Sequence, residues 1–146
     1  MLLTKKLLPA MLQDPTHKHH IVGVSSIVGM LGTPNMVPYS ATKFAMTGFM
    51  EALNYELMAD RAKNIVITTV HPFLVSMDEV SRKPSLRYQE LIGIVSVKKA
   101  VDEILLGIQR EDRDIYIPSS LHFLTRKCYY LYKKWLALIG GTKIST

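Results

Sequence analysis

Residues 21–49, IVGVSSIVGMLGTPNMVPYSATKFAMTGF, contain the clearest structural signal in this chain of 146 residues. The segment opens on a run of β-branched residues, continues through a polar loop with Gly and Pro, and ends with apolar residues at helical spacing. A short run that is apolar throughout is typical of a strand buried on both faces of a parallel sheet. We therefore expect a strand at residues 20–25, a loop to about Pro38 and a helix over residues 40–59.

Patterns on both sides of this segment continue the alternation of helix and strand. The sequence predicts helices over residues 2–12 and 97–109, strands at residues 64–70 and 114–118, and a last helix, basic and aromatic, to about Ile139. Because proline removes a backbone donor, Pro9 is expected near a helix end or at a kink, and His71-Pro72 is expected to end the second strand. Apolar residues spaced for burial are Phe44, Phe49, Leu53 and Leu57 in one helix, and Val97, Val101, Ile104, Leu105 and Ile108 in another.

Apolar strands that alternate with helices indicate an α/β fold, with a parallel sheet and helices on its faces. Three strands alone leave a bare sheet edge that another element must cover. We therefore interpret the chain as part of a larger α/β domain.

The composition is that of a folded chain whose charge is unevenly distributed. Hydrophobic residues make up 48% and charged residues 21%, which excludes a disordered chain, a collagen-like chain and a disulfide scaffold. The one cysteine, Cys128, has no partner for an internal disulfide, so a reducing compartment is expected. Residues 121–146 carry five basic residues and no acidic one, which is most of the net charge of +6. We therefore divide the chain into a nearly neutral body, residues 1–120, and a basic, aromatic tail, residues 121–146.

Two interpretations of the tail stay open. Cations interleaved with aromatic residues suit an interfacial segment at a membrane surface. The same pattern suits a solvated helix that covers the sheet and a substrate cleft. Nucleic-acid binding is not favoured, because the body is neutral and contains no recognised module. The N-terminus lacks the order of a signal peptide, and the uncharged residues 21–42 are too polar and too interrupted by proline to span a membrane.

A Tyr-x-x-x-Lys pair lies at the start of the helix predicted after Pro38. Tyr39 and Lys43 are four residues apart, so their side chains share one helical face. The same spacing occurs twice in the tail, but only this pair has a serine 13 residues upstream, Ser26, at the end of a predicted strand. Ligand sites of open α/β sheets lie at the carboxyl ends of strands. Ser26, Tyr39 and Lys43 therefore lie where a ligand site is expected.

Residues 21–49 resemble the catalytic segment of the short-chain dehydrogenase/reductases. In that family a strand ends in a Ser-Ser pair, a Gly follows four residues on, and then comes Tyr-x-x-x-Lys; Ser26, Gly29, Tyr39 and Lys43 fit this pattern. HPFLV, residues 71–75, falls where the family has a turn that contacts the nicotinamide. Residues 115–124 and the helix before them resemble the membrane-associated retinol and 17-beta-hydroxysteroid dehydrogenase branch.

The resemblance implies a role for each site residue. Tyr39 would exchange a proton with the substrate alcohol or carbonyl. A free tyrosine has a pKa near ~10, so the positive charges of Lys43 and of an oxidised nicotinamide are needed to favour the phenolate. Lys43 would also bond to the nicotinamide ribose, Ser26 would hold the substrate oxygen, and Pro72 and Val75 would join Tyr39 and Lys43 in binding the cofactor.

The resemblance further implies the C-terminal half of a Rossmann-type, doubly wound parallel sheet, with the N-terminal, cofactor-binding half absent from this chain. The glycines form no phosphate-binding loop, and the family's Asn-Asn-Ala-Gly segment is missing. Phe73 and Met77 depart from the family's usual residues at the nicotinamide turn, where Ser76 could substitute. The cofactor is expected to be NAD or NADP, and the residue that decides between them follows a strand outside this sequence.

The implied function is the interconversion of an alcohol and a ketone or aldehyde, with a small lipid substrate such as retinol or a hydroxysteroid. The branch implies the cytosolic face of the endoplasmic reticulum membrane or a lipid droplet, reached through residues 121–146; otherwise the protein would be cytoplasmic. The helix over residues 40–59 implies a homodimer. Activity of this half alone is not expected, and the alternative is a non-catalytic interaction or scaffold protein derived from a dehydrogenase half.

Three histidines near the first predicted strand raise the question of a metal site, but their spacing does not favour one. His17, His19 and His20 have no Cys or acidic ligand at convincing spacing, so we predict a solvated loop and no metal site. His71, at the end of the second predicted strand, is expected to be structural rather than catalytic.

Overall fold

The computed structural model describes residues 1–33, 35–76 and 94–121. In chain order the elements are α1 (Leu2–Gln13), β1 (His19–Val24), the 3-10 turn η1 (Ile27–Gly29), α2 (Val37–Ala59), β2 (Ile65–Pro72), β3 (Val75–Ser76), β4 (Val95–Ser96), α4 (Val97–Gln109) and β5 (Asp114–Ile117). The predictions for residues 122–146, including the basic, aromatic helix, lie outside the described residues.

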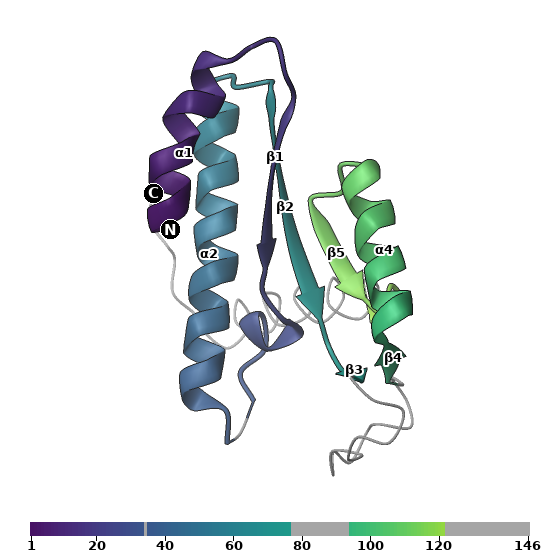
Figure 1. The fold of residues 1–146 in the computed structure, drawn as a ribbon. Helices are drawn as coiled ribbons and strands as arrows, with labels where there is room; N and C mark the ends of the chain where they lie inside the picture. The colour runs from purple at the N-terminus through teal and green to yellow at the C-terminus, as the bar shows by residue number, and fades with distance from the viewer. Residues whose placement is uncertain (34, 77–93, 122–146) are drawn as a thin grey trace, which may run out of the picture.

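The main sheet is parallel, with strand order β1-β2-β5. It lies between two helical layers, with α1 and α2 on one face and α4 on the other (Figure 1). The register pairs Val24 with Val70 between β1 and β2, and Ile117 with Pro72 between β5 and β2. The two-residue strands β3 and β4 form a separate parallel pair. The predicted α/β class is confirmed.

The two faces of the sheet bury two separate hydrophobic clusters. Side chains alternate along β2, so Ile65 and Ile67 face α2 while Val70 faces α4. The first cluster consists of Met50, Leu53, Leu57, Ile65 and Ile67. The second consists of Val70, Val95, Ala100, Ile115 and Ile117.

Both helices with an internal proline accommodate it. α2 begins at Val37 rather than at residue 40, because Pro38 lies in its first turn, where a backbone N–H has no intrahelical acceptor. Pro9 lies inside α1, which therefore lacks the bond that an N–H at this position would donate one turn back.

The strand predicted at residues 64–70 extends beyond its expected end. His71 and Pro72 belong to β2 and pair with Tyr116 and Ile117 of β5. Pro72 is the last residue of β2, where one missing donor costs little. The sequence pattern does not predict β3 and β4, because two residues are too few for a periodic signal.

The predicted buried faces of the two long helices are only partly correct. Leu53 and Leu57 are buried as predicted, whereas Phe44 is exposed. On α4, three of the residues predicted to be buried are exposed, namely Val97, Val101 and Leu105. Ile104 and Ile108 pack against the sheet as predicted, and small residues of α4 meet it as well. A Cβ on Gly107 would lie 2.5 Å from Cδ1 of Ile115, so the helix packs too closely for a larger side chain there.

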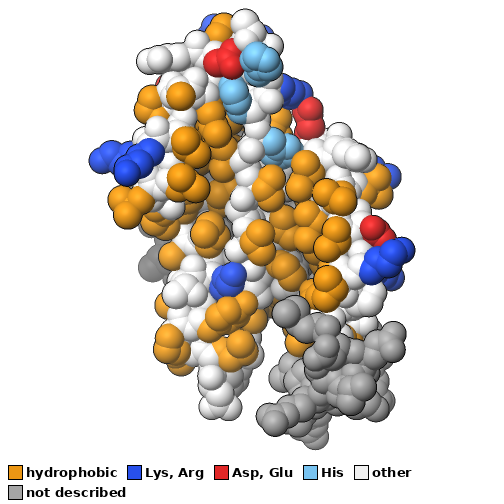
Figure 2. All heavy atoms as spheres, viewed as in Figure 1, with side chains coloured by type: hydrophobic (Ala, Val, Ile, Leu, Met, Phe, Trp, Pro, Cys, Tyr) orange, Lys and Arg blue, Asp and Glu red, His pale blue; other side chains and the backbone are white. Residues whose placement is uncertain are grey.

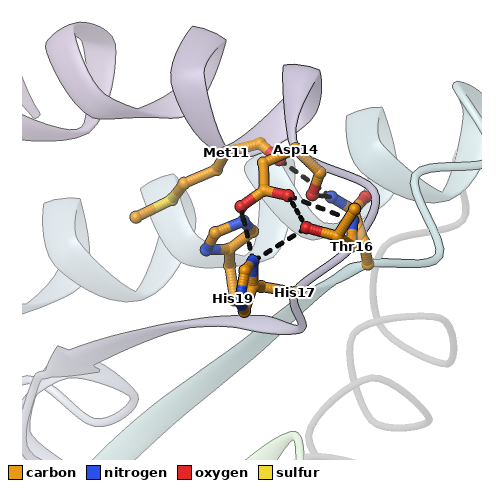
Figure 3. A network of polar contacts seen from close by, with 6 residues as sticks. Met11, Asp14, Thr16, His17 and His19 are labelled. Carbon is orange, nitrogen blue, oxygen red and sulfur yellow. Dashed lines mark hydrogen bonds and ion pairs between the residues drawn. The ribbon is translucent and has the colours of Figure 1, made fainter.

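The loop after α1 is held by polar contacts around Asp14 (Figure 3). Thr16 donates to Oδ1 of Asp14 through its backbone N–H at 3.0 Å and through its hydroxyl. Nδ1 of His17 lies 2.9 Å from Oδ2 of the same carboxylate, and Nε2 of His19 lies 3.6 Å from it. The amide of Asn64 donates to the carbonyl oxygens of Met11 and Asp14 at 2.8 and 3.0 Å. These contacts fix the end of α1 to the start of β2.

The prediction of a solvated loop holds for only one of the three histidines. His17 is exposed, but His19 and His20 are half-buried residues of β1. Nε2 of His20 lies 2.7 Å from the hydroxyl of Thr68 on β2, which donates in turn to the carbonyl oxygen of Asp112. The described part of the chain contains no group of three or more His, Cys, Asp or Glu residues suited to a metal ion. Within the same residues, no helix combines the length and the hydropathy needed to cross a membrane.

Candidate active site

Ser26 lies where β1 ends and η1 begins, with only 5% of its surface exposed. Its Oγ accepts a hydrogen bond from the backbone N–H of Val28 at 3.2 Å, which caps the turn. The same hydroxyl donates to the carbonyl oxygen of Pro72 at 3.1 Å. Ser26 therefore joins the carboxyl ends of β1 and β2, the edge of a parallel sheet where ligand sites form.

Ser25, which the sequence analysis did not single out, holds the site together. Its buried Oγ donates to the carbonyl oxygen of Lys43 at 3.0 Å and lies 2.7 Å from Oγ1 of Thr47. Both partners lie on α2, one turn apart. The two serines thus have different roles. Ser25 bonds α2 to the end of β1, and Ser26 bonds to the neighbouring strand, β2. The one hint of the Ser25 contact in the sequence is the polar residue Thr47, four positions after Lys43.

Gly29 is required because η1 and α2 approach closely beside Ser25. A Cβ at this position would lie 2.5 Å from Oγ of Ser25, 2.7 Å from the carbonyl oxygen of Lys43 and 2.8 Å from Oγ1 of Thr47. These distances are shorter than real contacts, and one of them is to backbone. A side chain on Gly29 would therefore push η1 away from the helix that carries the Tyr-Lys pair.

Tyr39 and Lys43 lie in the first two turns of α2, on one side of the helix. Nζ of Lys43 lies 5.5 Å from the centre of the Tyr39 ring, within the range of a cation–π contact. The ammonium donates to the carbonyl oxygen of Val24 at 3.2 Å. Tyr39 is 42% exposed, and among the described residues no hydrogen bond joins its hydroxyl to Ser26. The structure therefore brings Lys43 to the ring of Tyr39, and Tyr39 itself is partly exposed to solvent.

The segment predicted to contact the nicotinamide begins at the end of β2. The backbone N–H of Phe73 donates to the carbonyl oxygen of Ile117 at 2.9 Å. Val75 belongs to β3, pairs with Val95 and packs against the cluster under α4. Pro72 contributes its carbonyl oxygen to Ser26. Met77 lies outside the described residues.

His71 is buried beside this segment and has structural contacts. Its Nε2 lies 3.1 Å from Oδ1 of Asp114, and its ring stacks on Tyr116 with centroids 5.1 Å apart. Both partners belong to β5. His71 therefore ties β2 to β5, in accord with its predicted structural role.

The fold and the site place the chain among α/β proteins built on a parallel, Rossmann-type sheet. A family model described as short chain dehydrogenase matches residues 1–85, and the chain belongs to this family.

Curated relatives point to one branch of the family. The chain is 32% identical to human "Estradiol 17-beta-dehydrogenase 11" over 136 residues, which cover 93% of the chain and 43% of that protein. It is 30% identical to human "17-beta-hydroxysteroid dehydrogenase 13" over 138 residues, covering 94% and 44%. It is 32% identical to human "Epidermal retinol dehydrogenase 2" over 120 residues, covering 82% and 38%. The chain thus spans less than half the length of these relatives.

Solved structures show the same fold over about half of their length. A short-chain dehydrogenase from Sphingobium yanoikuyae in complex with NADPH matches 99% of the chain with a TM-score of 0.69 and 23% identity, and 53% of that protein is covered. The bulky-bulky ketone specific alcohol dehydrogenase from Comamonas testosteroni matches with a TM-score of 0.68 and 23% identity, covering 99% of the chain and 50% of that protein. The predicted partial Rossmann-type sheet is confirmed by these matches.

The residues present fit one end of a dinucleotide and not the other. Tyr39 and Lys43 offer a hydroxyl and an ammonium at the carboxyl edge of the sheet, where the ammonium donates to Val24 at the end of β1. The sequence contains no Gly-rich turn between a strand and a helix, which is the element that holds the pyrophosphate. The groups present would therefore suit the nicotinamide end of a dinucleotide alone.

Proposed function

We propose that this chain supplies the proton-transfer half of an NAD- or NADP-dependent oxidoreductase site, which interconverts an alcohol and a ketone or aldehyde. The observation that supports it is the rigid connection between Ser26 and the Tyr39–Lys43 helix, made by the hydroxyl of Ser25 on the carbonyl of Lys43. Such a connection keeps three chemically complementary groups at one sheet edge. The cofactor, when bound, supplies or accepts the hydride.

Each of the three side chains has a distinct task in this proposal. Tyr39 takes a proton from the substrate hydroxyl, or returns one to the carbonyl oxygen. The ammonium of Lys43, one turn along α2, favours the negatively charged phenolate of Tyr39. Ser26 holds the substrate oxygen, for which its proton must turn from the carbonyl oxygen of Pro72 toward the substrate.

A lipid alcohol or ketone is the proposed substrate class. The names of the curated relatives specify estradiol, hydroxysteroids and retinol, all small apolar molecules with one reacting oxygen. We also propose that the protein lies at the endoplasmic reticulum or at a lipid droplet. Residues 121–146, which are basic and aromatic, would contact its surface, and residues 1–120 would form the dehydrogenase part. A homodimer through α2, whose Phe44 is exposed, is proposed as well.

The chain alone is proposed to be inactive. Without a phosphate-binding turn, a dinucleotide loses most of its binding groups.

The test uses the chain fused behind the N-terminal half of human "Estradiol 17-beta-dehydrogenase 11", with retinol and estradiol as substrates and NAD(P)H absorbance as the readout. Tyr39→Phe should lower kcat by about 100-fold or more, because it removes the proton donor. The matched control is Tyr55→Phe, on the same helix but stacked under Arg113 and away from the site. Equal rates for Tyr39→Phe and the unsubstituted fusion would disprove the mechanism.

A second candidate function is a non-catalytic interaction protein. It is favoured by one observation, namely that the hydroxyl of Ser26 and the ammonium of Lys43 each donate a hydrogen bond to a carbonyl oxygen of the chain itself. Calorimetric titration of the fused protein with NAD and NADP separates the two functions. Binding of either dinucleotide supports the enzyme, and no binding of either supports the scaffold.

A further inference from the structure

The two ends of the main sheet differ in the charge of the residues around them. At the amino end of the strands lie Asp14 and the ion pair between Lys18 and Glu111. Acidic and histidine side chains gather at this end of the molecule (Figure 2). Residues 21–42, which lead through the carboxyl end of β1 to the first turn of α2, contain no charged residue, and Lys43 is the next cation. The fold therefore separates a charged end from an uncharged one.

The uncharged end exposes large apolar side chains directly before Tyr39. Leu31 is 51%, Met36 37% and Val37 74% exposed. All three lie between η1 and the first turn of α2. Single exposed apolar residues are ordinary on a protein surface, but several together in one uncharged segment indicate a surface that contacts another apolar phase.

The start of α4 adds apolar and basic residues at the same end of the sheet. β4 and the first turn of α4 lie at the end where α2 also begins (Figure 1). Ile94 and Val97 are each 41% exposed. Lys98 and Lys99 follow and are exposed as well. Nζ of Lys98 lies 3.9 Å from Oδ2 of Asp102, and a pair so exposed leaves the ammonium accessible to another anion.

The other carboxylates of α2 and of the first loop lie far from this end. The first acidic residue of α2 is Glu51, which at about 1.5 Å per residue lies about 20 Å along the helix from Val37. Asp14 lies beyond the opposite end of β1. Because charges in physiological salt are screened over roughly 8–10 Å, neither carboxylate repels an anionic surface at the uncharged end.

We define the apolar end of the fold by five exposed residues, namely Leu31, Met36, Val37, Ile94 and Val97. Apolar side chains with cations beside them suit the boundary between the acyl chains and the phosphate headgroups of a lipid surface. We propose that the apolar end docks on a phospholipid surface, with the ammonium groups of Lys98 and Lys99 at the headgroups. Tyr39 follows the apolar end directly, so a substrate dissolved in the lipid would reach the candidate site without crossing water. This last step rests on the proposed function, whereas the docking does not.

Two substitutions at opposite ends of one helix test the docking. The probe is a vesicle of phosphatidylcholine and phosphatidylserine, and binding of the full chain is measured by co-sedimentation. Val37→Asp should weaken binding by about tenfold or more, because a charge would have to enter the apolar boundary. The matched control, Met58→Asp, makes the same change of charge at an exposed apolar position in the last turn of α2 and should bind as the unsubstituted chain does. Equal binding by the two variants would overturn the proposal.

Unfolding does not confuse this comparison. An acidic residue in the first turn of a helix interacts favourably with the helix dipole, so Val37→Asp should keep its helical circular dichroism. Sedimentation velocity without vesicles checks the other possible occupant, a second copy of the chain. Self-association that Val37→Asp abolishes, without any loss of vesicle binding, would assign the apolar end to that second copy and overturn the proposal.

A fluorescent reporter locates the contact independently of affinity. In a chain with Trp135→Phe, the emission of a tryptophan introduced as Leu31→Trp should shift to shorter wavelength on vesicles and be quenched by brominated phosphatidylcholine. The same reporter introduced as Met58→Trp should show neither change. Equal quenching at the two positions in vesicle-bound protein would contradict docking through the apolar end.

These measurements need neither cofactor nor turnover, which separates the docking from the proposed function. Vesicle binding that Val37→Asp weakens, together with a fused protein that oxidises neither retinol nor estradiol, would contradict the proposed function alone. A fused protein that is active, but whose binding to vesicles is the same with and without Val37→Asp, would contradict the docking alone.

Discussion

The hydroxyl of Ser25 donates to the carbonyl oxygen of Lys43 at 3.0 Å, and this contact joins the end of β1 to the helix that carries the Tyr-Lys pair. Ser25→Ala would leave the Lys43 carbonyl with the hydroxyl of Thr47 as its remaining side-chain donor. Losing a buried partner typically costs about 1–3 kcal/mol. We expect the free energy of unfolding, measured by urea denaturation, to fall by this amount. The matched control is Thr42→Ala, which removes an exposed hydroxyl that donates to the Tyr39 carbonyl. This substitution should change the free energy of unfolding by less than about 0.5 kcal/mol. Equal losses in the two variants would contradict this role of Ser25.

Gly29→Ala tests the close approach of η1 and α2. The added methyl group would meet the carbonyl oxygen of Lys43 at 2.7 Å, and backbone cannot rotate away as a side chain can. Overpacking of this kind costs about 1–3 kcal/mol, so the urea midpoint should fall. The matched control is Gly48→Ala on α2, where no atom lies within 4 Å of the new Cβ. There the substitution should raise stability by up to about 1 kcal/mol, because alanine favours the helix. The same sign of change at both glycines would exclude the packing explanation.

Much of the fold follows from the sequence because its strands and helices have strong, different periods. The helix predicted over residues 97–109 is α4 at the same boundaries. The sides of the helices that are buried were harder to predict. Hydrophobic spacing correctly places Ile104 and Ile108 against the sheet, but it also assigns Val101 and Leu105 to the core, and both are exposed. The remaining contacts of α4 with the sheet come from Ala100 and Gly107. The reason is that a helix can pack closely on a sheet only through small side chains. An analysis of hydrophobic periodicity does not recognise Ala and Gly as contact residues.

The sequence proposes the members of the candidate site but does not show the hydrogen bonds that connect them. Ser26, Tyr39 and Lys43 follow from their spacing together. The role of Ser25 could not be predicted. Its partners are the carbonyl oxygen of Lys43 and the hydroxyl of Thr47, on a distant segment, and no residue type identifies a backbone acceptor in a sequence. The contact of Lys43 with the carbonyl oxygen of Val24 escaped prediction for the same reason.

The carboxylate of Asp14 provides a prediction for pH dependence. The hydroxyl of Thr16 donates to it, and this bond, with further help from His17 and the Thr16 N–H, lowers the pKa of Asp14 from 3.8 to about 2. Because the folded-state pKa lies below the unfolded value, the carboxylate stabilises the folded chain above about pH 3.8, and this contribution is lost as the pH falls through about 2. Thr16→Val removes the main donor, so the pKa of Asp14, followed by the carbon-13 shift of its carboxyl group, should rise toward 3.8. Thr33→Val, which removes a hydroxyl bonded to the carbonyl of Leu31 in another loop, should leave it near 2. If the pKa of Asp14 stays near 2 in Thr16→Val, then His17, rather than the hydroxyl of Thr16, holds the carboxylate in its charged form.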